Sequence, residues 1–210
     1  HSAERRPGGF FELSAAAATE PELAAEELGK REFIFDVQGH FVNPEGAWRE
    51  RAPGLERALS GLPNAGCTLA NGEPGGLACL GSERFVKDVF MDSDTDLMVL
   101  SFVPSKRDEE PLTIEEAAAT RAIVERLEGS HRLFLHARVN PNQPGDVEDM
   151  ERLAGFGVSA WKTYTQWGPD GRGFWMTDDA GIAFVEEARR LGVRNICIHK
   201  GIPFGRESYE

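Results

Sequence analysis

Basic residues, cysteines and long apolar runs are all scarce in this sequence of 210 residues. Its 23 lysines and arginines are outnumbered by 35 aspartates and glutamates, which gives a formal net charge of −12. Nucleic acids and anionic membranes attract positively charged surfaces, so this balance argues against either of them as a partner. No apolar run approaches the roughly 20 residues that a transmembrane helix needs. We therefore expect a globular protein that binds neither nucleic acid nor membrane.

The three cysteines, Cys67, Cys79 and Cys197, form an odd and sparse set without zinc-finger spacing. Such a set does not indicate a disulfide framework, so we interpret all three as reduced thiols, which favours a cytoplasmic location. Residues 1–30 are interpreted as an N-terminal extension with a short helix near residues 21–29. The pair Arg5-Arg6 resembles part of a twin-arginine export signal, but acidic residues interrupt the apolar stretch after it. Export is therefore the alternative to a cytoplasmic location.

Glycine-rich phosphate loops are absent as well. The turn after the first predicted strand, "QGHFVNPEG", lacks the pattern G-x-G-x-x-G, and G-x-x-x-x-G-K-[ST] occurs nowhere. These patterns bring backbone N–H groups close to the phosphates of a nucleotide. Their absence argues against a dinucleotide-binding protein and excludes a P-loop.

Five short stretches rich in β-branched, leucine and aromatic residues predict buried strands. These stretches cover residues 32–40, 96–103, 132–139, 158–164 and 194–199. Helical patterns lie between them, and strand–helix alternation is typical of parallel βαβ units. One connection, residues 41–81, is much longer than the others and is rich in Gly, Pro and Asn. Connections of this length in a compact domain are usually functional or disordered.

The starts of the predicted helices carry capping residues. Ser82 is expected to cap the first helix, and Thr113 with Glu116 forms a capping box for the next. Asp146 is expected to open a third helix, and Asp178 or Asp179 a fourth. Apolar spacing predicts which helix residues point inward. For the second helix these are Ala119, Ile123 and Leu127, and for the fourth they are Ile182, Val185 and Ala188.

Two architectures fit this order of elements, an open doubly wound sheet and an eight-stranded α/β barrel. The missing phosphate loop disfavours the first. Five strands are too few to close an eight-stranded barrel, which typically needs about 250 residues. We therefore predict that residues 31–210 supply about the first five units of a (β/α)8 TIM barrel.

Polar residues gather on one face of each predicted strand, because successive side chains point to opposite sides. In the first strand, Phe33, Phe35 and Val37 are predicted to share one face and Asp36, Gln38 and His40 the other. The polar sets of the later strands are Phe134, His136, Arg138 and Asn140; Lys162 and Tyr164 with Ala160; and Cys197 and His199 with Asn195. Imidazoles near the carboxyl ends of barrel strands could hold a divalent metal, which would lower the pKa of a bound water to about 7.

Three stretches carry a resemblance to a known family. "FDVQGH" resembles the D-x-H-x-H strand-1 signature of the amidohydrolase superfamily, and "ICIHKG" resembles its strand-5 histidine and glycine turn. "FVKDVFMDSDTDLMVLSFVP" is similar to the helix-1 and strand-2 region of the metal-dependent hydrolase branch that includes aminocarboxymuconate semialdehyde decarboxylase. The resemblance runs from about residue 32 to residue 205. It implies a TIM barrel with a catalytic metal.

The resemblance also implies roles for individual residues. His40, Gln38 and His199 would be metal ligands, with zinc as the expected metal and manganese as the alternative. Asp36 would hydrogen-bond to one of these ligands and orient it. Apart from the resemblance, we interpret His136 as a structural histidine or as a hydrogen-bond donor that orients a ligand in the same way. Lys162 lies where two-metal members carry a carbamylated bridging lysine, and the family's strand-6 histidine and strand-8 aspartate would lie beyond residue 210.

Contacts with a substrate are expected from residues near the same carboxyl ends of the strands. Lys162 and Arg138 are the candidates to meet negative charge on a substrate, and an ion pair with a buried acid is the alternative for Arg138. Tyr164 and Trp167 are candidates to line the substrate pocket, with core packing as the alternative for Trp167.

The expected activity is hydrolysis or non-oxidative decarboxylation of a small molecule that bears a carboxylate or a cyclic amide or ester. Gln38 stands where the family has a histidine. A catalytically inactive barrel that serves as a binding or scaffold protein is therefore the alternative. We leave a homodimer open.

Overall fold

The computed structural model describes residues 16, 19–28, 33–62, 66–69, 71–128 and 131–200. The chain divides into two compact units, His1–Ile34 and Phe35–Glu210. Helix α1 (Pro21–Leu28) belongs to the first unit and agrees with the short helix predicted there. Arg5 and Arg6 lie outside the described residues.

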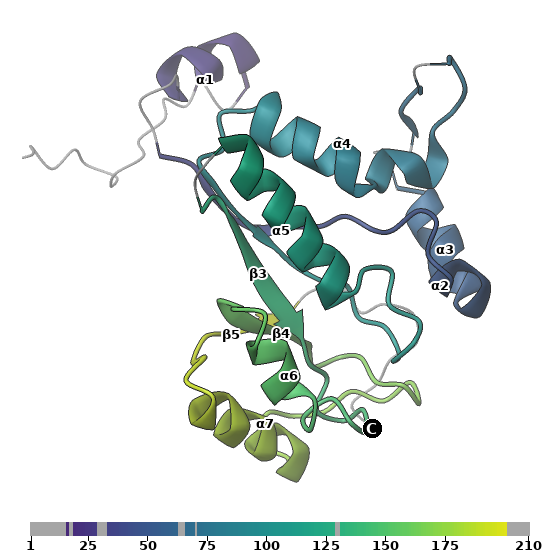
Figure 1. The fold of residues 1–210 in the computed structure, drawn as a ribbon, viewed down its shortest axis with the longest axis vertical. Coiled ribbons are helices and arrows are strands. Elements are labelled where there is room, and N and C mark those ends of the chain that lie inside the picture. The colour runs from purple at the N-terminus through teal and green to yellow at the C-terminus, as the bar shows by residue number, and fades with distance from the viewer. Residues whose placement is uncertain are drawn as a thin grey trace, which may run out of the picture. The chain divides into compact units, whose positions relative to one another are not determined.

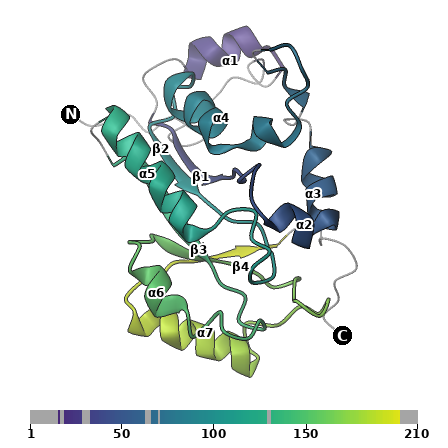
Figure 2. The ribbon, with the colours of Figure 1, turned by 45° about the vertical axis from the view of Figure 1, so that its right-hand side comes forward.

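The second unit is an α/β fold built on one five-stranded parallel sheet (Figure 1). Its strands follow chain order and are β1 (Phe35–Gly39), β2 (Leu97–Leu100), β3 (Leu133–Arg138), β4 (Ala160–Tyr164) and β5 (Ile196–His199). All five predicted strands are thus confirmed, in parallel order. The predicted burial of the first strand was wrong, because Phe35 and Val37 of β1 are 46% and 61% exposed. The sheet curls into part of a barrel (Figure 2), so side chains on its concave face approach one another across several strands.

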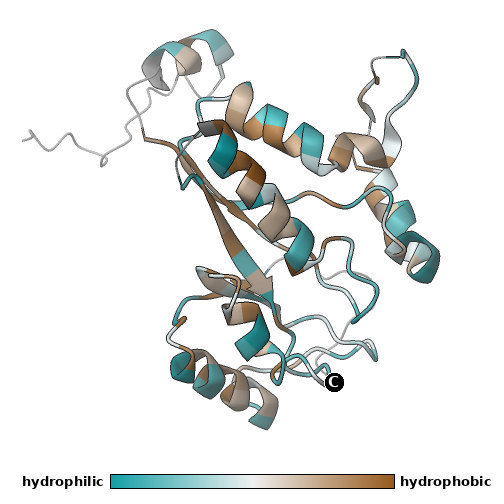
Figure 3. Ribbon diagram, in the orientation of Figure 1, coloured by the Kyte–Doolittle hydropathy of each residue, from teal (hydrophilic) through white to brown (hydrophobic). Residues whose placement is uncertain are grey.

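Helices cover the convex face of this sheet. They are α4 (Ser82–Val86), which continues as the π-helical turn η3 (Lys87–Met91), then α5 (Ile114–Glu128), α6 (Met150–Ala154) and α7 (Asp179–Arg190). The main core lies between these helices and the sheet, where Leu135 of β3 packs in one cluster with Val124, Met150 and Phe184. The ribbon of β3 is hydrophobic over its first half, and hydrophilic residues follow toward its carboxyl end (Figure 3).

Most of the residues that were predicted to point inward from two helices are exposed. In α5 the buried positions are Ala117, Thr120 and Val124, whereas Ile123 and Leu127 are 41% and 56% exposed. Thr120 is tolerated inside because its hydroxyl donates to the carbonyl of Glu116, 3.0 Å away. In α7 the prediction was right for Ala188, which is buried with Gly181 and Phe184, and wrong for Ile182 and Val185, which are exposed. The spacing of apolar residues therefore did not identify the buried face of these helices, because several large apolar side chains lie on the exposed face.

Two of the predicted helix starts were also wrong. Gly81, not Ser82, precedes α4, and Asp149, not Asp146, precedes α6. Asp178 does precede α7, as predicted, although its carboxylate accepts a hydrogen bond from the backbone N–H of Trp175 rather than from the helix.

The capping box at the start of α5 is confirmed. The backbone N–H of Thr113 donates to Oε2 of Glu116 (2.9 Å), and the N–H of Glu116 donates to Oγ1 of Thr113 (3.3 Å). Replacing an N-cap threonine by alanine typically costs about 1 kcal/mol. We expect Thr113→Ala to lower the free energy of unfolding by about this amount in urea denaturation. Thr113→Ser, which keeps the hydroxyl, should stay close to the parent, and equal losses in the two variants would contradict the assignment.

The long connection between β1 and α4 is folded rather than open. It contains α2 (Trp48–Arg51), α3 (Pro53–Ser60) and the 3₁₀ helix η2 (Gly76–Leu80). A second small core holds it together, built from Val42, Trp48 and Leu77.

A disulfide joins Cys67 to Cys79 within this connection. The interpretation of all three cysteines as reduced thiols was therefore wrong, and only Cys197 is free among the described cysteines. Two cysteines 12 residues apart give no sign in sequence of whether a turn brings them together. With the disulfide in place, the argument from reduced thiols no longer favours a cytoplasmic location.

Candidate functional site

The concave face of the sheet collects the polar residues that sequence parity predicted on three strands. Arg138 of β3 pairs in register with Lys162 of β4, and Lys162 pairs with Cys197 of β5. Two residues further along, Tyr164 pairs with His199. Paired residues in parallel strands point to the same side of a sheet, so all these side chains leave one face near the carboxyl ends of their strands.

Strand β1 departs from simple alternation. Phe35 was predicted on the face opposite Gln38, but its ring lies 6.1 Å from that of Phe134, on the face that also carries His136. The register of β1 against β2 shifts between Asp36 and Gly39. Such a shift inserts an extra residue and reverses which side chains face the core. Phe35 and Gln38 can therefore both reach the concave face, so the predicted separation was wrong.

Ser101, directly after β2, links two histidines of the concave face. Nδ1 of His40 lies 3.0 Å from the backbone carbonyl of Ser101, and Nδ1 of His136 lies 3.0 Å from the Ser101 hydroxyl. On its other side, Nε2 of His136 lies 3.5 Å from Sγ of Cys197. These contacts form one connected cluster on the concave face, made of His40, Ser101, His136 and Cys197.

Lys162 is the cation of this cluster. Its side chain is only 2% exposed, and its Nζ donates a hydrogen bond to Oε1 of Gln38 at 2.8 Å. The ammonium group also lies 5.1 Å from the centre of the Tyr164 ring. Burial lowers the pKa of Lys162, because removing an ammonium group from water disfavours its charged form.

The ring of His199 stacks on Tyr164, with ring centres 5.0 Å apart. The Tyr164 hydroxyl donates to the carbonyl of Phe102 at 2.6 Å, which ties the end of β4 to the segment after β2. Burial raises the pKa of Tyr164, so this hydroxyl stays protonated. Tyr164 therefore fixes the position of the His199 ring from one side.

Both histidines next to Ser101 are held in their neutral form. Burial is the main cause of the lowered pKa of His40, and the nearby charges of Lys162 and His199 lower it further. The hydrogen bond to Ser101 and the carboxylate of Asp36 act in the opposite direction. Burial, with a contribution from Lys162, lowers the pKa of His136 to about 4. Neutral imidazoles have a free lone pair for a proton or a metal.

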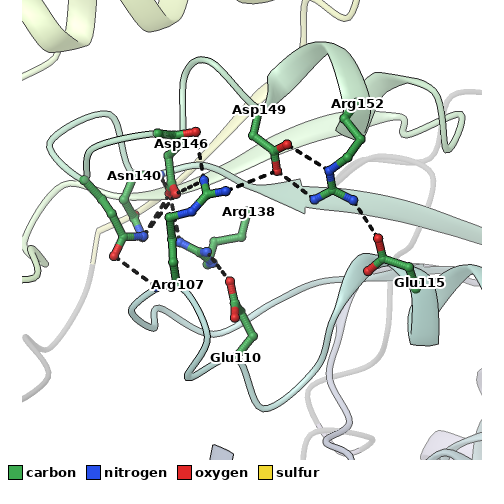
Figure 4. Close-up of polar contacts among 10 residues, drawn as sticks. Arg107, Glu110, Glu115, Arg138, Asn140, Asp146, Asp149 and Arg152 are labelled. Atoms are coloured by element: carbon green, nitrogen blue, oxygen red, sulfur yellow. Dashed lines mark hydrogen bonds and ion pairs between the residues drawn. The ribbon is translucent and has the colours of Figure 1, made fainter.

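Arg138 has acidic partners. Its guanidinium is 8% exposed and lies 2.9 Å from both Glu110 and Asp146 (Figure 4). Asp146 also accepts hydrogen bonds from the backbone of Asn140 and from Arg107. This network borders a cavity of about 210 Å³ beyond the ends of β2 and β3. The structure thus gives Arg138 the buried acid that was the alternative to substrate binding.

The remaining predicted residues lie at the edges of the cluster. Asp36 is exposed and accepts a hydrogen bond from the backbone N–H of Gln38 (3.0 Å). Trp167 is half-buried in the connection after β4, where its carbonyl accepts a hydrogen bond from Asn142. Sequence reasoning missed Ser101 altogether. Its only signal was its position at the carboxyl end of the apolar stretch 96–103.

Imidazole nitrogens are donors that bind divalent metals, and the predicted ligand set contains two of them, in His40 and His199. The contact of His40 Nδ1 with a backbone carbonyl requires Nδ1 to carry the proton, which leaves Nε2 as the metal-binding atom. Among the described residues, no three His, Cys, Asp or Glu side chains are grouped as metal ligands. The predicted set contains only two such residues. Its third member, Gln38, accepts a hydrogen bond from Lys162.

Neither a protein-family model nor a curated protein matches the chain. Across the described part of the chain, none of the helices has the length and apolar character required to cross a lipid bilayer.

Proposed function

We propose that this protein is a metal-dependent hydrolase or non-oxidative decarboxylase of the amidohydrolase type, acting on a small carboxylate-bearing or cyclic substrate. The proposal joins the resemblance of "FDVQGH" and "ICIHKG" to that family with the cluster on the concave face. The observation that carries it is the hydrogen bond between Lys162 and Gln38, residues 124 positions apart in the chain. This bond joins a side chain of β1 to a side chain of β4 on the concave face of the sheet.

His40 and His199 would hold the metal, with zinc expected and manganese as the alternative. The metal, when bound, would supply an activated water and a Lewis acid. The residues of the chain would do the rest. Ser101 fixes the tautomer of His40, and Tyr164 fixes the ring of His199. Lys162 would bind the negative charge of the substrate, because it is a buried cation whose described hydrogen-bond partner, Gln38, is neutral. Arg138 would position the surrounding loops.

We also propose that the sheet belongs to a complete (β/α)8 barrel. Apolar side chains are exposed at both edges of the sheet, on β1 at Phe35 and Val37 and on β5 at Ile198. The outer face of α7 likewise exposes Ile182 and Val185. Further β/α units next to β5 and β1 would bury these side chains and cover both open edges.

Equilibrium dialysis against zinc or manganese tests the metal site. We expect about one ion per chain, and a loss of affinity of at least tenfold in His199→Ala and in His40→Ala, since removal of one ligand weakens a metal site. His131→Ala is the matched control, because His131 is a 90% exposed histidine that pairs with Glu125 on the surface. Folded protein that binds no metal, or variants that bind as tightly as the parent, would reject the proposal.

A second candidate, a binding or scaffold protein without activity, draws support from the same contact. Gln38 replaces a family histidine and is occupied by Lys162. This candidate predicts that Gln38→His raises the affinity for zinc while the parent hydrolyses or decarboxylates none of a panel of amides, lactones and β-keto acids. Turnover of any of these substrates by the parent would decide against it.

A further inference from the structure

One half of the disulfide, Cys79, lines a cavity together with His40, from which it is 39 residues away in sequence. Cys79 is 6% exposed and lines a cavity of about 180 Å³ together with His40 and Gly39. The helix η2 that carries Cys79 is bonded to the chain that leaves β1, because the N–H of Val42 donates to the carbonyl of Leu80 at 2.8 Å. A movement of η2 is therefore transmitted to the backbone two residues after His40.

The other half of the disulfide lies in a tight turn. Thr68 and Pro74 form an isolated antiparallel bridge, and the N–H of Gly75 donates to the carbonyl of Cys67 at 2.8 Å. A Cβ atom at Gly75 would lie 2.2 Å from Sγ of Cys79, so only glycine lets the backbone pass this close to the sulfurs. The turn is thus shaped around the disulfide.

The two sulfurs differ in their access to solvent. Cys67 is half-buried and is flanked by exposed residues, whereas Cys79 is only 6% exposed and lines the cavity next to His40. Thiol–disulfide exchange begins with attack of a thiolate on an accessible sulfur. A reductant would therefore attack the sulfur of Cys67. The sulfur of Cys79 would be released as a thiolate into the cavity that it shares with His40.

From these contacts we propose that the Cys67–Cys79 disulfide is a redox switch that controls the position of His40. A dithiol reductant transfers two electrons and two protons to the disulfide, which yields two cysteine thiols and the cyclic disulfide of the reductant. The turn that carries Cys67 is then tied to η2 by backbone bonds alone. Helix η2 loosens, the Val42–Leu80 bond opens more often, and the backbone after His40 is held less tightly, although the N–H of Ser101 still donates to the carbonyl of Gly39. This proposal holds whether or not a metal binds.

The test compares oxidised protein with protein reduced by dithiothreitol, by hydrogen exchange and by NMR of labelled histidine rings. Reduction should add two hydrogens in mass, expose two thiols besides Cys197, and raise the exchange rate of the Val42 amide at least tenfold. The ring signals of His40 should shift, while those of the exposed His131 and the amide exchange of β3 should stay unchanged.

Cys67→Ser should reproduce the reduced state without reductant, and Cys197→Ser should respond to dithiothreitol as the parent does. Because reduction acts on folded parent protein, the test does not depend on how well either variant folds. A loosened Val42 amide with unchanged His40 signals would overturn the proposed coupling. Unchanged Val42 exchange after complete reduction, or purified protein with three free thiols under non-reducing conditions, would overturn the switch itself.

Discussion

Asp146→Asn should lower the free energy of unfolding by about 3–5 kcal/mol, because it leaves a buried arginine without half of its counter-charge. Asp146 is 3% exposed, and its carboxylate lies 2.9 Å from both Arg138 and the backbone N–H of Asn140. It also accepts hydrogen bonds from Gln143 and from Arg107, and Figure 4 labels Arg107 beside it. Asparagine keeps the shape of the side chain but supplies one oxygen instead of two and no charge.

Urea denaturation measures the free energy of unfolding of Asp146→Asn and of the control variant Asp88→Asn. The difference between their losses is the contribution of burial. Asp88 pairs with Arg84 at 2.7 Å, but both side chains are nearly half exposed, so this replacement should cost less than about 1 kcal/mol. Equal losses in the two variants would show that burial of the Asp146 pair has no special weight.

The parallel sheet was predictable from the sequence because short apolar stretches alternate with helical patterns. Apolar residues recur about every 3.6 residues in a helix, which distinguishes these patterns from the strands between them. In β3, β4 and β5 the alternation of side chains held throughout, so the predicted meeting of Lys162, Cys197 and His199 on one face was correct. Such regular strands keep the same residues on the same face from end to end. The sequence therefore contains enough information to group the chemistry of these three strands.

The exception, β1, shows the limit of parity. One extra residue between Asp36 and Gly39 reverses the faces, and nothing in "FDVQGH" marks where the insertion falls. The position becomes visible only against β2, since the sulfur of Met98 occupies the space where a Cβ of Gly39 would lie. A contact between residues this far apart in the chain depends on the register of two strands, which local sequence does not encode.

Asp146 shows a second limit. An aspartate shortly before an apolar helical pattern has the features of an N-cap, and we predicted it as one. The partner that decides its role, Arg138, lies eight residues earlier on the concave face of β3. The alternative role of Arg138 in an ion pair was foreseen, but the identity of its acid was not, because many acidic residues follow in the sequence and only the curvature of the loop selects one.

Acid should destabilise the protein well before its carboxylates are protonated, because His136 is buried in its neutral form. Its pKa is about 4 in the folded protein, against 6.5 for an ordinary histidine. Above pH 6.5 both states of the chain leave the ring neutral, and its full contribution to stability is present. As the pH falls from 6.5 toward 4, the unfolded chain binds a proton that the folded protein does not, so the free energy of unfolding decreases. The loss should reach about 3 kcal/mol, at about 1.4 kcal/mol for each unit of pKa difference.

Urea denaturation of the parent and of His136→Gln at several pH values between 7 and 4 measures this loss. Glutamine can still bond to the Ser101 hydroxyl but does not titrate, so the variant should start less stable at pH 7 and lose about 3 kcal/mol less on acidification. His40 has a lowered pKa too and destabilises in the same direction, which leaves a residual slope in the variant. The lowered pKa of Asp149 acts only below its ordinary value of 3.8 and stays outside this range.

Replacement of the exposed His131 by glutamine separates this effect from a general consequence of losing a histidine. Its side chain is 90% exposed, so His131→Gln should follow the curve of the parent. Parallel curves for the parent and His136→Gln would mean that the ring of His136 accepts a proton within the folded protein. Its contacts with Ser101 and Cys197 would then not keep the ring neutral. The charged ring would lie near the ammonium group of Lys162, and the two positive charges would repel each other unless a substrate anion bound between them.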